Sequence, residues 1–171
     1  MMECIGWGKK INMESIPICS ENRQQINDFL KEHWFSTDMV VRGKIFDLSK
    51  AEGFAAMEDG RITGLVTYEM RGKVCEILSL DSLTERRGIG TALVGKVSEA
   101  AKGCGCSKLV LITTNDNLNA MQFYQKRGFD MTRLYHNALD VSRKIKPEIP
   151  LIGDNGIPLK HEIEFELDLC R

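Results

Sequence analysis

The strongest constraint on the fold of this chain is a strand, a loop, a helix and a second strand that follow one another in its middle. Residues 74–80 are predicted to form a strand, and residues 91–102 place their apolar side chains on one helical stripe that ends at Gly103. Residues 108–114 form a near-continuous apolar run, which is typical of a strand buried on both faces. This order predicts two parallel strands joined by a right-handed crossover.

The loop before the helix predicts an anion-binding site. Residues 85–91 read Glu-Arg-Arg-Gly-Ile-Gly-Thr, and Gly88 and Gly90 let the backbone turn with its N–H groups pointing inward. The first N–H groups of the helix are unpaired and lie at the positive end of its dipole, so a phosphate docked there gains several hydrogen bonds. Arg86 and Arg87 either add positive charge beside this site or are solvated loop residues, and the sequence leaves both interpretations open.

Two common phosphate-binding patterns do not fit this loop. Residues 90–96 match the first seven places of G-x-x-x-x-G-K-[ST], but Val97 stands where a magnesium-binding hydroxyl is required. Residues 88–93 begin like G-x-G-x-x-G, yet Leu93 occupies the place of the small residue that packs helix against strand. A nucleoside triphosphatase and a dinucleotide-binding fold are therefore disfavoured.

Composition narrows the class of protein further. A chain of 171 residues with 43% apolar content is expected to form one packed domain, residues 1–171. The net charge of −1, with 27% charged residues of both signs, argues against partners such as nucleic acid or an acidic membrane and favours a small ligand. Six cysteines without a disulfide framework and an N-terminus without signal architecture indicate the cytoplasm. No metal site is expected, because the cysteines and histidines lack ligand spacing.

The rest of the chain predicts an antiparallel meander before the loop and further strands after it. Residues 54–58 and 61–70 are strands joined by the Asp59-Gly60 turn, whereas residues 35–50 show no clear period and are predicted as a loop with one short helix. The remaining predictions are an extended edge segment over 11–19, a helix over 21–34 with Ser20 as its N-cap, a helix over 118–126 capped by residues 115–117, a strand over 129–135, a helix over 138–145 and a strand over 163–169 with one buried face.

Two stretches together resemble the GNAT superfamily of N-acetyltransferases. Residues 86–91 look like the core of the family's [QR]-x-x-G-x-[GA] segment, although Glu85 stands where Gln or Arg is usual. Residues 117–129 fill every defined position of the family's N-x-x-A-x-x-F-Y-x-K-x-G-F segment. The resemblance covers residues 54–134, with residues 163–169 as the expected closing strand.

The resemblance implies both a fold and an activity. The fold is α/β (α+β), with a mixed, mostly antiparallel central sheet of about six to seven strands, flanking helices and a parallel pair that splays apart at the coenzyme site. The activity is transfer of an acetyl group from acetyl-coenzyme A (acetyl-CoA) to a primary amine on a small molecule or a peptide. Residues 137–161 then form an insertion that serves as a lid or as a contact in a homodimer, and the sequence does not decide between them.

The resemblance also implies the residues that bind and react. The residues expected to contact the coenzyme are Leu78, Leu80, Arg86, Arg87, Gly88, Ile89, Gly90, Thr91, Asn117 and Tyr124. Tyr124 is the candidate acid that protonates the departing sulfur, because a phenol keeps its proton at neutral pH. Glu76 is the first candidate base for the amine and Asp81 the second. Alternatively, Glu76 is a solvent-facing strand residue, Tyr124 packs beside Phe123, and Asn117 is a helix N-cap, a role that is compatible with coenzyme contact.

The sequence does not define the amine that accepts the acetyl group. The residues considered for its site are His33, Trp34, Arg42, Tyr68, His136 and segment 147–158, and each also has a packing or surface explanation. Two rival functions stay open beside the enzyme. One is a coenzyme-binding sensor without turnover, which Glu85 keeps open, and the other is a purely structural interaction module.

Overall fold

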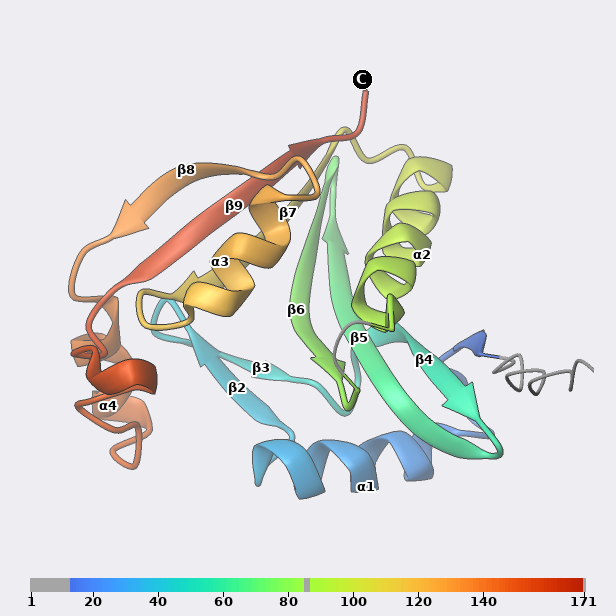
Figure 1. Ribbon diagram of the computed structural model, residues 1–171, viewed down its shortest axis with the longest axis horizontal. Helices are drawn as coiled ribbons and strands as arrows, with labels where there is room; N and C mark the ends of the chain where they lie inside the picture. Colours follow the sequence, from blue (N-terminus) through green and yellow to red (C-terminus); the bar gives the residue numbers. More distant parts are fainter. Residues whose placement is uncertain (1–12, 85–86, 171) are drawn as a thin grey trace, which may run out of the picture.

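The computed structural model describes residues 13–84 and 87–170, which form a seven-stranded sheet flanked by helices (Figure 1). The strand order is β1-β4-β5-β6-β7-β9-β8, and a separate hairpin contains β2 and β3. The strands are β1 (Glu14–Pro17), β2 (Asp38–Val41), β3 (Lys44–Asp47), β4 (Glu52–Glu58), β5 (Arg61–Arg71), β6 (Val74–Ser82), β7 (Lys108–Thr114), β8 (Asp130–Tyr135) and β9 (Glu162–Asp168). The helices are α1 (Arg23–Trp34), α2 (Ile89–Gly103), α3 (Leu118–Gln125) and α4 (Ala138–Ile145).

The sheet confirms the predicted mixed architecture with one parallel pair. β6 and β7 are parallel neighbours, and every other pair of neighbours in the sheet is antiparallel. The β6–β7 register runs from Val74 opposite Lys108 to Ile77 opposite Leu111 and ends there, although both strands continue. The two strands therefore separate beyond Ile77, and Figure 1 shows the resulting V between the two halves of the sheet.

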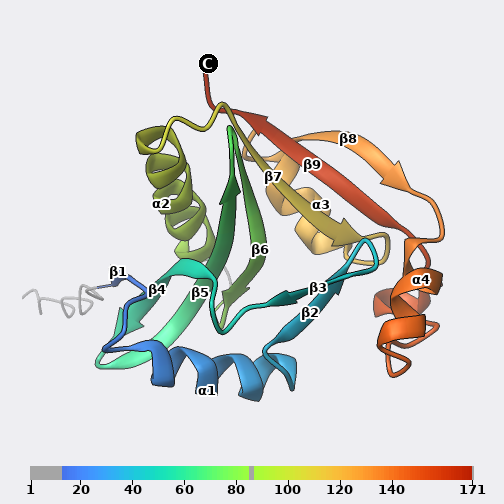
Figure 2. The same cartoon turned by 180° about the vertical axis from the view of Figure 1, so that it is seen from behind.

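Two hydrophobic clusters lie on opposite faces of this sheet. The larger cluster joins α2 and α3 to β5, β6, β7 and β9, and Leu93, Tyr124 and Phe165 are among its buried members. The smaller cluster packs α1 against β4 and β5 through Ile26 and Leu30. Figure 2, seen from behind, shows the β2–β3 hairpin lying across the face opposite α3. Each apolar helix stripe thus covers one face of the sheet and fixes the helix ends relative to the gap.

The prediction of a loop with one short helix over residues 35–50 is wrong, because this segment forms the β2–β3 hairpin. Its two-residue turn, Arg42-Gly43, has φ values of 51° and 66°. Such turns usually show Asn-Gly or Asp-Gly in sequence, and Arg at the first position hides the signal. The left-handed backbone at Arg42 is held by a distant contact, since its N–H donates to Glu162 Oε2 at 2.9 Å.

The predictions for the caps of α1 and α3 and for the last strand had different outcomes. Ser20 is not the N-cap of α1; that position belongs to Asn22, whose Oδ1 accepts from the Cys19 N–H. Asn117 caps α3 as predicted, because its Oδ1 accepts from the Ala120 N–H at 3.0 Å. The strand predicted over 163–169 forms as β9, with Phe165 buried on its apolar face. On the other face exposure increases from Glu162, which is 2% exposed, to the exposed Asp168.

The segment between β8 and β9 contains α4, as predicted, and a short 3-10 turn over Asp154–Gly156. α4 lies against the β2–β3 hairpin, where a Cβ on Gly43 would approach Val141 Cγ1 to 2.8 Å. Across the described ranges, none of the helices has the length and hydropathy of a membrane span.

Candidate functional site

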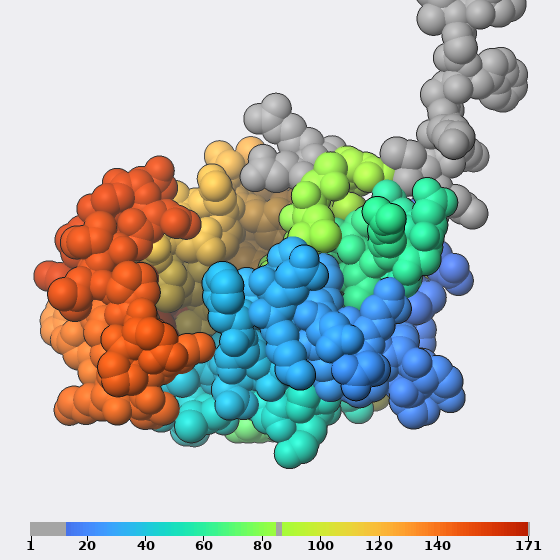
Figure 3. Space-filling view, turned by 90° about the horizontal axis from the view of Figure 1, so that it is seen from below, coloured from blue at the N-terminus to red at the C-terminus, as the bar shows by residue number. Residues whose placement is uncertain are grey.

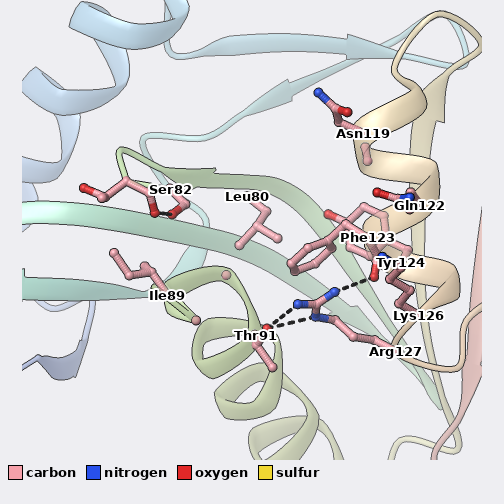
Figure 4. A pocket seen from close by; sticks show the side chains of 14 residues that line it. Leu80, Ser82, Ile89, Thr91, Asn119, Gln122, Phe123, Tyr124, Lys126 and Arg127 are labelled. Carbon is pink, nitrogen blue, oxygen red and sulfur yellow. Dashed lines mark hydrogen bonds between the residues drawn. The ribbon is translucent and has the colours of Figure 1, made fainter. Parts of the chain in front are cut away.

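A cavity of about 600 Å³ opens between the N-terminal end of α2 and the side of α3 (Figure 4). Gly88 is the N-cap of α2 and adopts φ 75°, a conformation that glycine reaches without strain. Ala92 donates the first helical hydrogen bond, to the Gly88 carbonyl, so the N–H groups before it have no partner within the helix. The lining residues are Leu80, Ser82, Thr84, Gly88, Ile89, Gly90, Thr91, Asn119, Ala120, Gln122, Phe123, Tyr124, Lys126 and Arg127.

A side chain at Gly90 would press on Phe123, because the two helices approach each other closely there. A Cβ at Gly90 would lie 3.1 Å from Phe123 Cζ and 3.2 Å from Phe123 Cε2. The same helix offers a contrast at Gly95, where a Cβ would meet nothing within 4 Å. Glycine therefore suits the two positions of the predicted anion site for different reasons. Gly88 has a left-handed backbone, and Gly90 lies at a tight contact between helices.

Positive charge at this helix end comes from Arg127, which the sequence analysis missed. Arg127 Nε donates to Thr91 Oγ1 at 3.0 Å, its Nη1 donates to the Phe123 carbonyl at 2.7 Å, and its guanidinium carbon lies 3.4 Å from the centroid of the Phe123 ring (Figure 4). Position 127 is an undefined place in the segment N-x-x-A-x-x-F-Y-x-K-x-G-F, so the motif gave no reason to select it. Only its charge and its closeness to Gly128 could have suggested a role.

Arg87, one of the two arginines selected from the sequence, is paired outside the cavity. Arg87 makes a two-pronged contact with Glu58, with Nη1–Oε2 at 3.0 Å and Nη2–Oε1 at 2.7 Å. This pairing directs its side chain towards β4. Glu85 and Arg86 lie outside the described residues.

Tyr124 lines the cavity and is also a core residue, so the predicted packing beside Phe123 is confirmed and its role as an acid stays a prediction. It is 6% exposed and packs edge-on against Phe129, with ring centroids 5.4 Å apart. Burial raises the pKa of its phenol, the negative charge of Asp81 raises it further, and Arg127 opposes the shift. The hydroxyl is therefore protonated at neutral pH and can act as a proton donor.

The far end of β6 presents its side chains to two different faces. Leu80 and Ser82 line the cavity, whereas Asp81 between them points to α1, where Trp34 Nε1 donates to its Oδ1 at 3.1 Å and its Oδ2 at 3.0 Å. Burial raises the Asp81 pKa, while the Trp34 hydrogen bond and the charge of His33 lower it. Leu78 sits at a bulge in the β5–β6 pairing and packs on the α1 side.

Glu76 belongs to a carboxylate group centred on Arg42. Arg42 Nη2 lies 2.6 Å from Glu76 Oε1, and its Nη1 lies 3.8 Å from Glu164 Oε2. Glu164 also accepts from the Tyr135 hydroxyl at 2.7 Å. A third carboxyl group, that of Glu162, accepts from the backbone N–H of Arg42, and burial raises its pKa. The Arg42 guanidinium therefore already occupies one oxygen of Glu76, so an amine would have to share this carboxylate with it.

The other residues considered for an acceptor site are scattered. Tyr68 is buried in the cluster beneath α2, where burial raises its pKa to about 12. The His33 ring lies 4.3 Å from that of Phe29, and the His136 ring stacks on that of His161 at 4.8 Å. Trp34 and Arg42 contact Asp81 and Glu76 as described. Figure 3 shows a hollow between the segment containing α4 and the surface formed by α1 and β2, with the β7–α3 region behind it.

A second cavity, of about 710 Å³, lies at the opposite end of α2 and suits an anion less well. Lys102 and Lys108 line it together with Asp130 and Glu166. Lys108 is already paired with Glu166 at 3.0 Å, and the C-terminal end of a helix carries partial negative charge. In the described part of the chain no group of His, Cys, Asp and Glu side chains is arranged to hold a metal ion.

Comparisons with known proteins agree with this geometry. The sequence model of the acetyltransferase (GNAT) family matches residues 18–129. The uncharacterized protein YdhI of Bacillus subtilis is 46% identical over 144 residues, which cover 84% of this chain and 90% of that protein.

Two solved structures share the fold. A GNAT family acetyltransferase from Elizabethkingia anophelis, with acetyl-CoA bound, has a TM-score of 0.66 at 23% identity, covering 92% of this chain and 98% of that one. A Bacillus subtilis acetyltransferase in complex with CoA has a TM-score of 0.63 at 20% identity, covering 93% and 99%. Because the family model matches most of the chain and YdhI is 46% identical to it, the chain belongs to the acetyltransferase (GNAT) family.

Proposed function

We propose that this protein is an N-acetyltransferase that moves the acetyl group of acetyl-CoA to a primary amine. One observation carries the proposal: the cavity with unpaired backbone donors at α2 continues to Tyr124 and Leu80, where β6 and β7 separate. The structures of related fold from Elizabethkingia anophelis and Bacillus subtilis contain acetyl-CoA and CoA, which supports this assignment of the cavity.

The diphosphate of the coenzyme fits the N-terminal end of α2. The left-handed Gly88 and the side-chain-free Gly90 leave the N–H groups of residues 88–91 open to a ligand. Thr91 Oγ1 and the guanidinium group of Arg127 border the same space and add a hydroxyl and a positive charge. Asn117, as the N-cap of α3, orients the other wall of the cavity.

The acyl end of the coenzyme fits the gap between β6 and β7. Beyond Ile77 the edge of β6 that faces β7 has no ladder partner, so its N–H and C=O groups can pair with an extended pantetheine arm as an added strand does. A backbone N–H near Leu78 or Leu80 is then placed to polarise the thioester carbonyl. Holding the two reactants together can lower the barrier by up to roughly 7 to 11 kcal/mol.

Tyr124 supplies the proton that the departing sulfur needs. The neutral amine nitrogen attacks the thioester carbon, the C–N bond forms and the C–S bond breaks. The phenol O–H protonates the thiolate, and the phenolate recovers a proton from the nitrogen, which leaves the neutral amide and the CoA thiol. Burial keeps this proton on the phenol in the resting protein, which is the state that a general acid requires.

Calorimetry with acetyl-CoA and thiol release with a panel of primary amines test the proposal together. We expect the wild type to bind acetyl-CoA and to release CoA when an amine is present. Tyr124→Phe removes one oxygen from a well-packed ring, so affinity should be retained while turnover falls by about 10²- to 10⁴-fold. Binding without turnover by the wild type would support a coenzyme sensor, and no binding would contradict the proposal altogether.

A further inference from the structure

Residues 147–161 form most of the connection between α4 and β9 and border the hollow seen in Figure 3. They contain one short 3-10 turn, over Asp154–Gly156, and one isolated bridge, but no longer helix or strand. A connection of this length without regular structure is uncommon in a compact domain and is usually either functional or disordered. Hydrogen bonds from the end of β7 and from α4 hold this one in place, which favours a function.

The hollow lies beside α1 and the β2–β3 hairpin, which cover the face of the sheet opposite α2 and α3. The coenzyme cavity reaches the gap between β6 and β7 from the α2 and α3 side, so an attacking amine needs a different approach. We infer that the hollow is the acceptor cleft, that residues 147–161 are a fixed wall of this cleft, and that Asn115 and Asp116 are positioning residues that hold the wall. The inference rests on the proposed function and deepens it, because the place of the wall determines which amines fit.

Asn115 holds the part of the wall that leads into β9. Its Oδ1 accepts from the backbone N–H groups of Lys160 at 2.9 Å and His161 at 2.8 Å. Its Nδ2 donates to the Pro158 carbonyl at 2.9 Å, and its own backbone N–H donates to the His161 carbonyl at 3.0 Å. An amide side chain has two donors and two acceptor positions, so Asn115 uses most of its hydrogen-bonding capacity on this one segment.

Asp116 holds the middle of the wall through a very close approach. This carboxylate is 6% exposed, and its Oδ2 accepts from the Asp154 N–H at 2.9 Å. Its Oδ1 accepts from the Thr114 hydroxyl. A Cβ on Gly153 would lie 2.0 Å from Asp116 Oδ2, although Gly153 has a φ of −98° that any residue adopts. Glycine therefore stands at this position because a side chain would occupy the place of the carboxylate.

Arg143 on α4 holds the wall from its other side. Its Nε donates to the Ile149 carbonyl at 3.2 Å, and its Nη2 donates to the Pro150 carbonyl at 2.6 Å. A lid has to leave its closed position in each cycle, and here the contacts of Asn115, Asp116 and Arg143 would all have to break. The arrangement therefore fits a wall that is already in place before the substrates bind.

The turn that holds the wall also fixes the coenzyme helix. Asn115 and Asp116 are followed directly by Asn117, whose Oδ1 caps α3, and α3 carries Tyr124 into the cavity. Three consecutive residues thus set the distance between the acceptor wall and the proposed proton donor. A small displacement at this turn changes the geometry of attack, and a misplacement of about 1 Å can cost up to about 100-fold in rate.

Asp116→Ala and Gly153→Ala disturb the same contact from its two sides. With the amine of highest turnover in the panel and saturating acetyl-CoA, each variant should raise the KM for the amine by about 10- to 100-fold, with little change in acetyl-CoA affinity by calorimetry. In the double variant the methyl group at position 153 no longer meets a carboxylate, so the loss should be smaller than the product of the two single losses.

Gly103→Ala is the control, because a Cβ there meets nothing within 4 Å, and it should leave the KM for the amine unchanged. A purely structural role of Asp116 would lower the Tm and the active fraction, and hence the apparent kcat, without moving this KM. An unchanged KM in both Asp116→Ala and Gly153→Ala would overturn the inference.

A fixed wall also sets a size limit for the acceptor. In a series of linear primary amines from propylamine to octylamine, wild-type kcat/KM should fall steeply beyond one chain length. Asn115→Ala removes three side-chain hydrogen bonds to the wall and should flatten this dependence. An equal loss for every amine in the series would contradict a role of Asn115 in placing the wall.

Backbone amide exchange followed by NMR tests the wall when no amine in the panel reacts. The N–H groups of Asp154, Lys160 and His161 should exchange slowly in the free protein and at the same rates with acetyl-CoA bound, and Asp116→Ala should speed the exchange at Asp154. Fast exchange in the free protein that acetyl-CoA slows would indicate a lid and contradict the inference, although the coenzyme binds. Absent acetyl-CoA binding would instead contradict the proposed function and the inference that rests on it.

Discussion

The two sides of the β6–β7 gap are built by different means. On the cavity side the parts are glycines, backbone N–H groups and a helix pair, and the longest side-chain link, from Arg127 to Thr91, spans 36 positions. On the α1 side the contacts are charged and distant: Trp34 reaches Asp81 across 47 positions, and Arg42 reaches Glu162 across 120. Motif positions therefore identify most of the cavity side, whereas the contacts on the α1 side can be recognised only in the folded chain.

The sharpest way to break the cofactor side alone is to fill the space at Gly90. In Gly90→Val the new side chain would overlap the Phe123 ring, whose Cζ lies 3.1 Å from the Cβ position. Overpacking of this kind costs about 1 to 3 kcal/mol in the free energy of unfolding. Because Gly90 and Phe123 both line the cavity, acetyl-CoA affinity should also fall in calorimetry.

Gly95→Ala is the matched control on the same helix. A Cβ there meets nothing within 4 Å, and alanine stabilises a helix interior by about 0.5 to 1 kcal/mol relative to glycine. Thermal unfolding should show a higher Tm with unchanged acetyl-CoA affinity. Equal losses in both variants would mean that the helix as a whole, rather than its contact with Phe123, governs binding.

The side of the gap opposite the cavity is best broken at Arg42, which pairs with both Glu76 and Glu164. Arg42→Ala would leave half-buried carboxylates without a counter-charge, and we expect a loss of about 2 kcal/mol in the free energy of unfolding by urea. Acetyl-CoA affinity should change little, because no Arg42 contact reaches the cavity lining.

Arg71→Ala is the control for this loss. Its partner Glu69 and Arg71 itself are 41% and 59% exposed, so removal of the pair should cost less than about 1 kcal/mol. A comparable loss in the two variants would show that Arg42 has no special role in joining the hairpin to β6 and β9.

The smallest expected effect concerns charge at the cofactor side. Arg127→Gln keeps a donor near Thr91 but removes the positive charge beside α2, and charged hydrogen bonds contribute about 1.5 to 3 kcal/mol. Acetyl-CoA affinity should fall by about tenfold in low salt and by less at high salt, because salt screens the lost attraction. The control is Lys96→Gln, on the exposed face of α2. It should change acetyl-CoA affinity neither in low salt nor in high salt.

The sequence was sufficient where neighbouring residues determine the structure. The meander, the α2 crossover unit and the Asn117 cap all follow from periodicity, turn residues and a side chain within reach of its own helix. The hairpin at Arg42-Gly43 could not be predicted from its own residues, because a distant carboxylate, that of Glu162, holds the unusual turn.

The same distinction applies to the candidate site. Tyr124, Gly88 and Gly90 were selected from motif positions, and the cavity brings them together. Arg127 could not be selected, since its role depends on the crossing of α2 and α3. Asp81 and Glu76 looked alike in sequence as acidic residues on one strand, and their different partners, Trp34 and Arg42, separate them only in three dimensions.

The most direct test of the account is a crystal structure of the protein with acetyl-CoA. We expect the diphosphate on the N–H groups of residues 88–91 and the thioester sulfur beside Tyr124, with the acetyl group in the gap between β6 and β7. A coenzyme found instead in the cavity at the C-terminal end of α2, beside Lys102 and Lys108, would contradict the assignment of the site.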